Sequence, residues 1–411
     1  MNSFQNAVKN AVRDRTSDIY ITGGHPMVTR THGEILFHHG QVWSHREVDE
    51  LVKMLLTPKQ MEMLRERNSV DQAITYSDVR LRINFFVTTR GLSLAVRILP
   101  GRIPTIDMLN LHPSLNDITG LTSGLVLTCG STGVGKTSTI AALIDGINRT
   151  RAVHIITLEN PVEYRFQSNK AFIQQRELGS HMPSFAQGLV DVLRENPDVI
   201  VVGELREPET MQLTLNAAQS GHLVISTLHA STPEEAIYRL CNAVPSDSQN
   251  ELRYQIASTL KWLIIQQLTY LDRVKLRVPL LTIVRGNASV KSLIRENKLN
   301  QISTAIQTGK GDGMFTAERY MNEYLLLKSN FEQPGEIFQP SPETSQEILY
   351  RSPLLDPSQD NTLPRKRVTG EEGQPVTGSA ECAAGDVDKP LTSDHEDVSI
   401  QDLIKQLNGK G

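Results

Sequence analysis

The first hundred residues carry two different hydrophobic periods. Apolar residues spaced three and four apart over residues 4–12 predict a helix, and the same spacing over residues 45–67 predicts a helical stretch with a break at Pro58. Residues 18–22 and 27–30 predict strands on either side of a Gly23-Gly24 turn. Apolar and polar residues alternate, as in half-buried strands, within residues 79–85 and 92–98. Together these elements predict a small α+β domain over residues 1–100.

The last two of these predicted strands form a hairpin with arginines on its polar face. In the first of them the odd positions are apolar, so Arg80 and Arg82 share the opposite face. Arg97 lies on the polar side of the second strand, and Arg90 lies in the turn between them. From the pattern alone, these arginines fit ordinary surface positions of a sheet.

A different pattern follows residues 101–115, which are proline-rich and predict a linker. From residue 116 onward, short apolar runs alternate with helical segments, and this order predicts a parallel sheet covered on both faces. The predicted strands are residues 125–128, 153–158, 198–202 and 223–227. The end of this region, residues 246–330, is expected to be mostly helical with one strand at 278–284. The fold class is therefore α/β, with the parallel sheet in a domain over residues 116–330.

Residues 331–411 differ from the rest because large apolar side chains are few. Such a composition predicts disorder, since it cannot bury enough surface to fold. Residues 398–408 are the exception, and they predict one short amphipathic helix. Its apolar stripe consists of Ile400, Leu403, Ile404 and Leu407. Both a frayed tail and a docking motif fit this pattern.

Composition narrows the classes of function. The net charge of −4 over 411 residues gives no reason to expect a nucleic-acid partner. The three cysteines are too widely spaced for a disulfide framework or a zinc site, which favours a reducing cytoplasm. We find neither an apolar run of the roughly 18 residues that a membrane span needs nor an apolar signal core at the N-terminus. Any membrane association is therefore expected to go through a partner protein.

The clearest chemical motif is a phosphate loop at residues 130–137, with the pattern G-x-x-x-x-G-K-[ST]. An apolar strand precedes it and a helix follows, and this context indicates a nucleotide site. We expect ATP and Mg²⁺ there, with Lys136 on the β- and γ-phosphates and the Thr137 hydroxyl on the metal ion. The residues expected to bind the nucleotide here are Gly130, Ser131, Thr132, Gly133, Val134, Gly135, Lys136, Thr137 and Ser138.

Two carboxylates follow strands of the predicted sheet. Glu204 ends the apolar run 198–203, where it either orients or deprotonates the attacking water or holds Mg²⁺ through water. Glu159 follows the second strand at the carboxyl edge, where ligands bind in open α/β sheets. Each carboxylate also has a non-catalytic interpretation. Glu204 fits an acidic residue near a helix N-terminus. Glu159 fits a solvated loop residue, and this interpretation is favoured more strongly for Glu163.

His222 and His229 flank one buried strand. They are seven residues apart and so cannot easily chelate one metal ion. We expect a role in nucleotide sensing or in subunit contact, with a hydrogen-bonded structural role as the alternative.

This set of motifs resembles the secretion-ATPase superfamily of type II secretion, type IV pili and type IV secretion, and most closely its PilT-type retraction branch. The family's Walker A, Asp, Walker B and His boxes match residues 130–137, 157–164, 198–204 and 221–229. Later segments such as Gln175–Gly179 also match. The resemblance covers residues 1–330. In the Asp box, however, Asn160 replaces the family's aspartate, which indicates a divergent member.

The resemblance implies a PAS-like first domain, a RecA-like ATPase domain over residues 116–330, and a homohexameric motor that acts in pilus retraction. It places Arg82, Arg90 and Arg97 near the γ-phosphate, Glu204, Glu159 and His229 in catalysis, and His222 at the nucleotide. It also implies a cytoplasmic protein, peripherally associated with the bacterial inner membrane through a platform protein. Secretion or conjugative transfer through a type IVB-like machine stays open, as does a non-motor regulatory paralogue. The acidic balance disfavours a nucleic-acid helicase.

Overall fold

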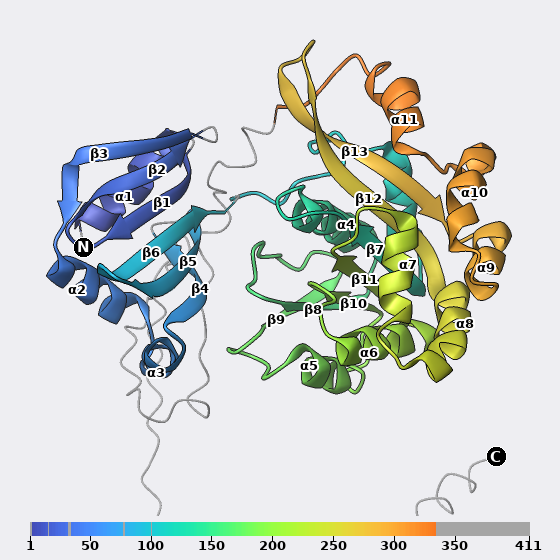
Figure 1. The fold of residues 1–411 in the computed structure, drawn as a ribbon, viewed down its shortest axis with the longest axis horizontal. Helices are drawn as coiled ribbons and strands as arrows, with labels where there is room; N and C mark the ends of the chain where they lie inside the picture. The colour runs from blue at the N-terminus through green and yellow to red at the C-terminus, as the bar shows by residue number, and fades with distance from the viewer. Residues whose placement is uncertain (1, 15, 32–33, 77–78, 100, 334–411) are drawn as a thin grey trace, which may run out of the picture. The chain divides into compact units, whose positions relative to one another are not determined.

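Two β-sheets organise the chain in the computed structural model (Figure 1). The structure describes residues 2–14, 16–31, 34–76, 79–99 and 101–333. The amphipathic helix expected at 398–408 lies outside these residues and stays a prediction. Within the described part of the chain, none of the helices is both long and apolar enough to cross a membrane.

The first sheet is antiparallel and has the strand order β3-β2-β1-β6-β5-β4. Its strands are β1 (Thr16–Thr22), β2 (His25–Thr31), β3 (Glu34–Trp43), β4 (Ser69–Tyr76), β5 (Val79–Thr88) and β6 (Gly91–Ile98). Its helices are α1 (Asn2–Arg13), α2 (His45–Leu55) and α3 (Pro58–Arg67). Buried apolar residues between Phe4 and Ile98 form one cluster between helices and sheet. The arginine hairpin is β5 and β6, which pair in antiparallel register.

Local signals explain the helix boundaries of this part. Ser44 and Glu47 form a capping box at the start of α2. Thr57 and Gln60 form another at the start of α3, where Pro58 occupies the first turn. Pro58 therefore begins a helix rather than interrupting one, which explains the break in the helical spacing.

The second sheet has the order β13-β12-β7-β11-β10-β8-β9, and every neighbouring pair is parallel except β12 and β13. Its strands are β7 (Gly124–Cys129), β8 (His154–Glu159), β9 (Phe172–Glu177), β10 (Val199–Val202), β11 (Leu223–Leu228), β12 (Leu260–Leu271) and β13 (Leu276–Arg285). The α/β class with a mostly parallel sheet is confirmed. All the side chains of β7 are buried, as expected for a strand covered on both faces.

Helices bury both faces of this sheet. Helix α4 (Lys136–Thr150) contributes to the apolar cluster on one face, together with the 3₁₀ helix Pro113–Gly120. The other cluster takes its residues from six helices. These are α5 (Phe185–Val192), α6 (Pro208–Gln219), α7 (Pro233–Cys241), α8 (Gln249–Thr259), α9 (Ala288–Arg295) and α10 (Ile302–Thr308). The short helix α11 (Ala317–Tyr320) follows them. Both clusters are contiguous, so the strand ends are held in fixed relation to one another.

Strand β12 departs from the sequence-based expectation of a mostly helical region. Its 12 residues pair with β7 on one side and β13 on the other. The run Trp262–Ile265 is continuously apolar, so its period does not separate a buried strand from a buried helix. Pairing with β7 decides the matter, because it places this run inside the sheet directly beside the phosphate loop.

Candidate functional site

The phosphate loop connects the carboxyl end of β7 to the first turn of α4. Gly130, Gly133 and Gly135 all have positive φ angles, of 147°, 83° and 90°. A side chain at Gly130 would have its Cβ only 2.3 Å from the backbone oxygen of Gln266. Glycine is therefore required there both by conformation and by space. The loop is built as a backbone cradle at a helix N-terminus, an arrangement that suits phosphate.

Lys136 folds back over this loop. Its Nζ donates to the carbonyl oxygens of Gly130 at 2.7 Å and Ser131 at 2.8 Å. Burial lowers the pKa of Lys136, while the nearby carboxylate of Glu204 acts in the opposite direction. Thr137, in the first turn of α4, is exposed. The loop therefore presents a cation and a hydroxyl beside its backbone N–H groups.

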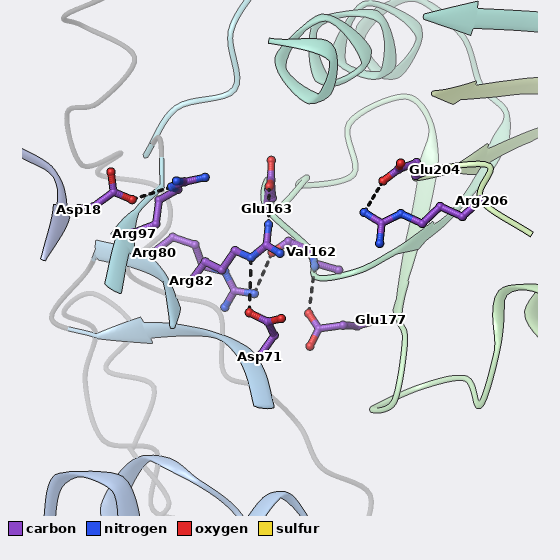
Figure 2. Close-up of polar contacts among 10 residues, drawn as sticks. All are labelled: Asp18, Asp71, Arg80, Arg82, Arg97, Val162, Glu163, Glu177, Glu204 and Arg206. Carbon is purple, nitrogen blue, oxygen red and sulfur yellow. Dashed lines mark hydrogen bonds and ion pairs between the residues drawn. The ribbon is translucent and has the colours of Figure 1, made fainter. Parts of the chain in front are cut away.

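Glu204 lies just beyond the end of β10, where two basic side chains approach its carboxylate. Its Oε1 lies 2.8 Å from Nε2 of His229, and its Oε2 lies 2.7 Å from Nη2 of Arg206. Figure 2 shows the Arg206 guanidinium turned toward this carboxylate. His229 follows the end of β11, the strand between β7 and β10. The sheet order thus brings Glu204 and His229 to the same edge as the phosphate loop.

Glu159 ends β8 at this same edge. Its Oε1 accepts from the Thr157 hydroxyl at 2.6 Å and from the Gln175 amide at 3.0 Å. Burial raises the pKa of Glu159 to about 7, against the influence of these two hydrogen bonds. A carboxyl group with a pKa near neutrality can exchange a proton at working pH. Gln175 belongs to a segment that matches the family, but its contact with Glu159 was not predictable from that match.

His222 lies at the other end of β11. Its backbone oxygen accepts from Gly124 at the start of β7, and its ring lies 3.0 Å from the Ser220 hydroxyl and 3.0 Å from the Ala217 oxygen. Six strand residues at about 3.3 Å each separate it from the edge that carries the phosphate loop. His222 thus lies at the opposite end of β11 from the phosphate loop of its own chain, and its role at the nucleotide stays a prediction.

The N-terminal arginines form part of a polar row on the first sheet. Arg82 and Arg97 are directly opposite each other on β5 and β6. Arg97 is paired with buried Asp18, at 2.8 Å between Nε and Oδ1. Arg82 reaches Glu163 at 3.5 Å and Asp71 at 3.9 Å, as Figure 2 shows. These carboxylates offset the repulsion that two facing arginines would otherwise suffer.

Two further arginines of this hairpin behave differently. Arg80 is buried, and its Nη2 donates to the Val162 carbonyl at 3.1 Å (Figure 2). Arg90 lies at the β5–β6 turn with an exposed side chain, while its carbonyl oxygen lies 3.1 Å from Nε2 of His45. In the described residues, Arg82 and Arg80 thus contact the segment after β8, whereas Arg90 does not share that contact.

The segment after β8 also reaches the phosphate-loop helix. The hydroxyl of buried Tyr164 lies 2.8 Å from the Ser138 hydroxyl on the first turn of α4. Gln175 holds the same segment through its side-chain amide. It donates to the backbone carbonyl oxygen of Tyr164 at 2.8 Å and accepts from the backbone N–H of Phe166 at 3.0 Å. The segment between β8 and β9 therefore contacts Arg82 through Glu163 and contacts the first turn of α4 through Tyr164.

Comparison with known proteins decides the family. The model of the family described as "Type II/IV secretion system protein" matches residues 2–310. The chain belongs to the type II/IV secretion system protein family. It is similar to a twitching motility protein of Neisseria gonorrhoeae, with 37% identity over 76% of this chain and 85% of the relative. The type IV pilus retraction ATPase PilT of Pseudomonas aeruginosa is 33% identical over 75% of this chain and 90% of its own length.

Solved structures agree with this membership. The crystal structure of the pilus retraction motor PilT with bound ADP has a TM-score of 0.72 and 34% identity, and it covers 82% of this chain and 97% of that one. The ATPase DotB of Legionella pneumophila, at 24% identity and a TM-score of 0.64, shares the fold over 78% of this chain and 94% of its own. With its intact phosphate loop, the chain is a nucleotide-binding, PilT-like ATPase of the secretion and pilus family.

Proposed function

We propose that residues 130–138 bind ATP with Mg²⁺ and that Glu204 is the principal catalytic carboxylate. The observation that carries this proposal is the gathering of loop, carboxylate and histidine at one sheet edge, where Glu204 lies close enough to influence the pKa of Lys136. Lys136 would exchange its two loop carbonyls for the β- and γ-phosphates, and the Thr137 hydroxyl would hold Mg²⁺.

Glu204 orients or deprotonates the attacking water, or holds Mg²⁺ through water. His229 and Arg206 fix the carboxylate from two sides, so its oxygens keep a defined direction. Glu159, with its pKa of about 7, is a second group that can take up a proton at this edge. His229 acts on the reaction by orienting Glu204.

We propose that the N-terminal arginines provide charge to the γ-phosphate from another domain. Phosphoryl transfer depends on positioning and charge stabilisation, and an arginine finger contributes roughly 10³–10⁵ in rate. Arg82 and Arg97 are held by carboxylates in the present structure and are available to exchange them for phosphate oxygens. Arg90 has the exposed side chain that such a contact also needs. The domains involved are residues 1–100 and 116–330, joined by the linker 101–115.

At the level of the cell, we propose a cytoplasmic homohexamer that drives type IV pilus retraction. The similarity to a twitching motility protein and to a pilus retraction motor over most of their lengths supports this role. The proposed partner is an inner-membrane platform protein. Closure of the N-terminal domain onto the nucleotide, followed by reopening on hydrolysis, is the proposed working stroke.

A secretion or conjugation machine is the second candidate. The fold similarity to DotB is compatible with it, while the greater identity to pilus motors favours retraction. A non-motor regulatory paralogue is the third candidate, and only Asn160 in the Asp box points toward it.

The experiment replaces the chromosomal gene with Lys136→Ala or wild type and measures both pilus retraction and protein export in the same strains. Retraction loss with normal export supports the leading proposal. Export loss with normal retraction supports the second candidate, and normal function of both in the Lys136→Ala strain supports the paralogue. Mass photometry of the purified chain with Mg²⁺ and ADP tests the hexamer, and a monomer under all conditions would contradict it.

A further inference from the structure

Gln266 is a buried polar residue directly behind the phosphate loop. It lies on β12, is 1% exposed, and comes immediately after the apolar run Trp262–Ile265. Its Nε2 donates to the carbonyl oxygen of Val134 at 2.7 Å, and its Oε1 accepts from the Thr139 hydroxyl at 2.8 Å. A buried amide of this kind needs partners, and both of these partners belong to the loop–helix motif.

The backbone of Gln266 contacts the same loop at its beginning. Its carbonyl oxygen would lie 2.3 Å from a Cβ at Gly130, and its Nε2 would lie 3.2 Å from a Cβ at Gly135. One residue of β12 thus packs against both ends of the loop. The interaction with Thr139 extends this contact into α4, whose first turn is closed by the hydrogen bond from the Thr139 N–H to the Gly135 oxygen at 3.0 Å.

We infer that Gln266 is a positioning residue that sets the direction of a backbone N–H in the nucleotide site. In a trans peptide the C=O and the following N–H point in opposite directions. Because the Val134 carbonyl is held toward Gln266, the Gly135 N–H is turned away from it. The Gln266 amide therefore holds this loop donor in place before phosphate arrives, and Thr139 anchors the amide itself. The inference rests on the proposal that residues 130–138 bind the nucleotide.

The test compares variants of the full chain by isothermal titration with Mg·ADP and by steady-state ATPase kinetics. Gln266→Leu removes both hydrogen bonds and is expected to weaken ADP binding roughly 10- to 100-fold, the worth of one hydrogen bond to a charged group. Gln266→Glu keeps the acceptor for Thr139 but loses the donor to Val134, so it should weaken binding similarly. Thr139→Val removes only the anchoring bond and should have a smaller effect.

Two control variants separate positioning from general stability. Gln267→Leu changes the exposed neighbour on the same strand and should bind ADP as wild type does. Val278→Ala creates a small cavity in the buried part of β13, and it should lower the melting temperature while leaving ADP affinity within about twofold. Normal ADP affinity in Gln266→Leu, or an equal loss in Val278→Ala, would overturn the inference.

Lys136→Ala distinguishes this inference from the proposed function. If Lys136→Ala loses ADP affinity while Gln266→Leu keeps it, only the positioning role fails. If Lys136→Ala also binds normally, the nucleotide site itself is misassigned. Should Gln266→Leu fail to fold, Gln266→Glu against Thr139→Val gives the same comparison, and equal wild-type affinity in both would overturn the role of the amide.

Discussion

The pKa of Glu159 gives a measurable dependence of stability on pH. Burial raises this pKa from the ordinary 4.5 to about 7, so the folded protein holds a proton that the unfolded chain releases between these two values. The contribution of Glu159 to stability is therefore most favourable below pH 4.5 and falls as the pH rises to about 7. Since one pKa unit is worth about 1.4 kcal/mol, the ionised Glu159 costs the folded state roughly 3 kcal/mol at pH 8 as an upper limit.

Glu159→Gln removes this titration while keeping an oxygen for Thr157 and Gln175. Relative to wild type, the variant should gain roughly 1–3 kcal/mol of unfolding free energy between pH 5 and pH 8. A fixed cost of the new amide is the same at both pH values and cancels in this difference. Other titrating groups also change the stability of both proteins with pH. The contribution of Glu159 is therefore measured as the difference between wild type and Glu159→Gln.

Urea unfolding followed by tryptophan fluorescence provides the assay. The chain has two tryptophans, and in a Trp43→Phe background the signal comes from Trp262 on β12 of the second sheet. Glu209→Gln, at an exposed position in the first turn of α6, is the matched control and should follow wild type at both pH values. Parallel pH dependence of wild type and Glu159→Gln would refute the raised pKa.

Further variants test separate parts of the site. Glu204→Gln should lower kcat by ~10²–10⁴ with little change in nucleotide affinity, measured by phosphate release and by titration with fluorescent ATP, while Glu209→Gln should do neither. A parallel loss of affinity would make Glu204 a metal ligand or a structural residue. Arg82→Ala should lower turnover at least about tenfold without weakening ADP binding, and full turnover would remove it from catalysis. Tyr164→Phe deletes the contact with Ser138 and should lower the unfolding free energy by about 1 kcal/mol, so unchanged urea unfolding would show that the contact contributes nothing.

The local parts of the site were predictable from the sequence. The phosphate loop is a contiguous motif between a strand and a helix, and its context fixes its geometry. The arginine hairpin was also visible, because strict alternation assigned Arg82 and Arg97 to one polar face, and the register of β5 and β6 places them opposite each other.

The non-local parts were not predictable. The contact between Glu204 and His229 depends on the strand order, which brings residues 25 positions apart together at 2.8 Å. Strand β12 was missed because its apolar run has no distinguishing period. The contacts of Gln175 and Gln266 were not predicted, because the partners of a neutral amide depend on which groups the fold places around it.

The central claim is that the loop around Lys136 hydrolyses ATP. The most direct test is phosphate release from Mg·ATP by the purified full chain and by Lys136→Ala, with circular dichroism and melting temperature measured for both. We predict that the variant keeps the wild-type spectrum and loses turnover to background, because the only change is the loss of the cation at the phosphates. Wild-type turnover in folded Lys136→Ala would contradict the account.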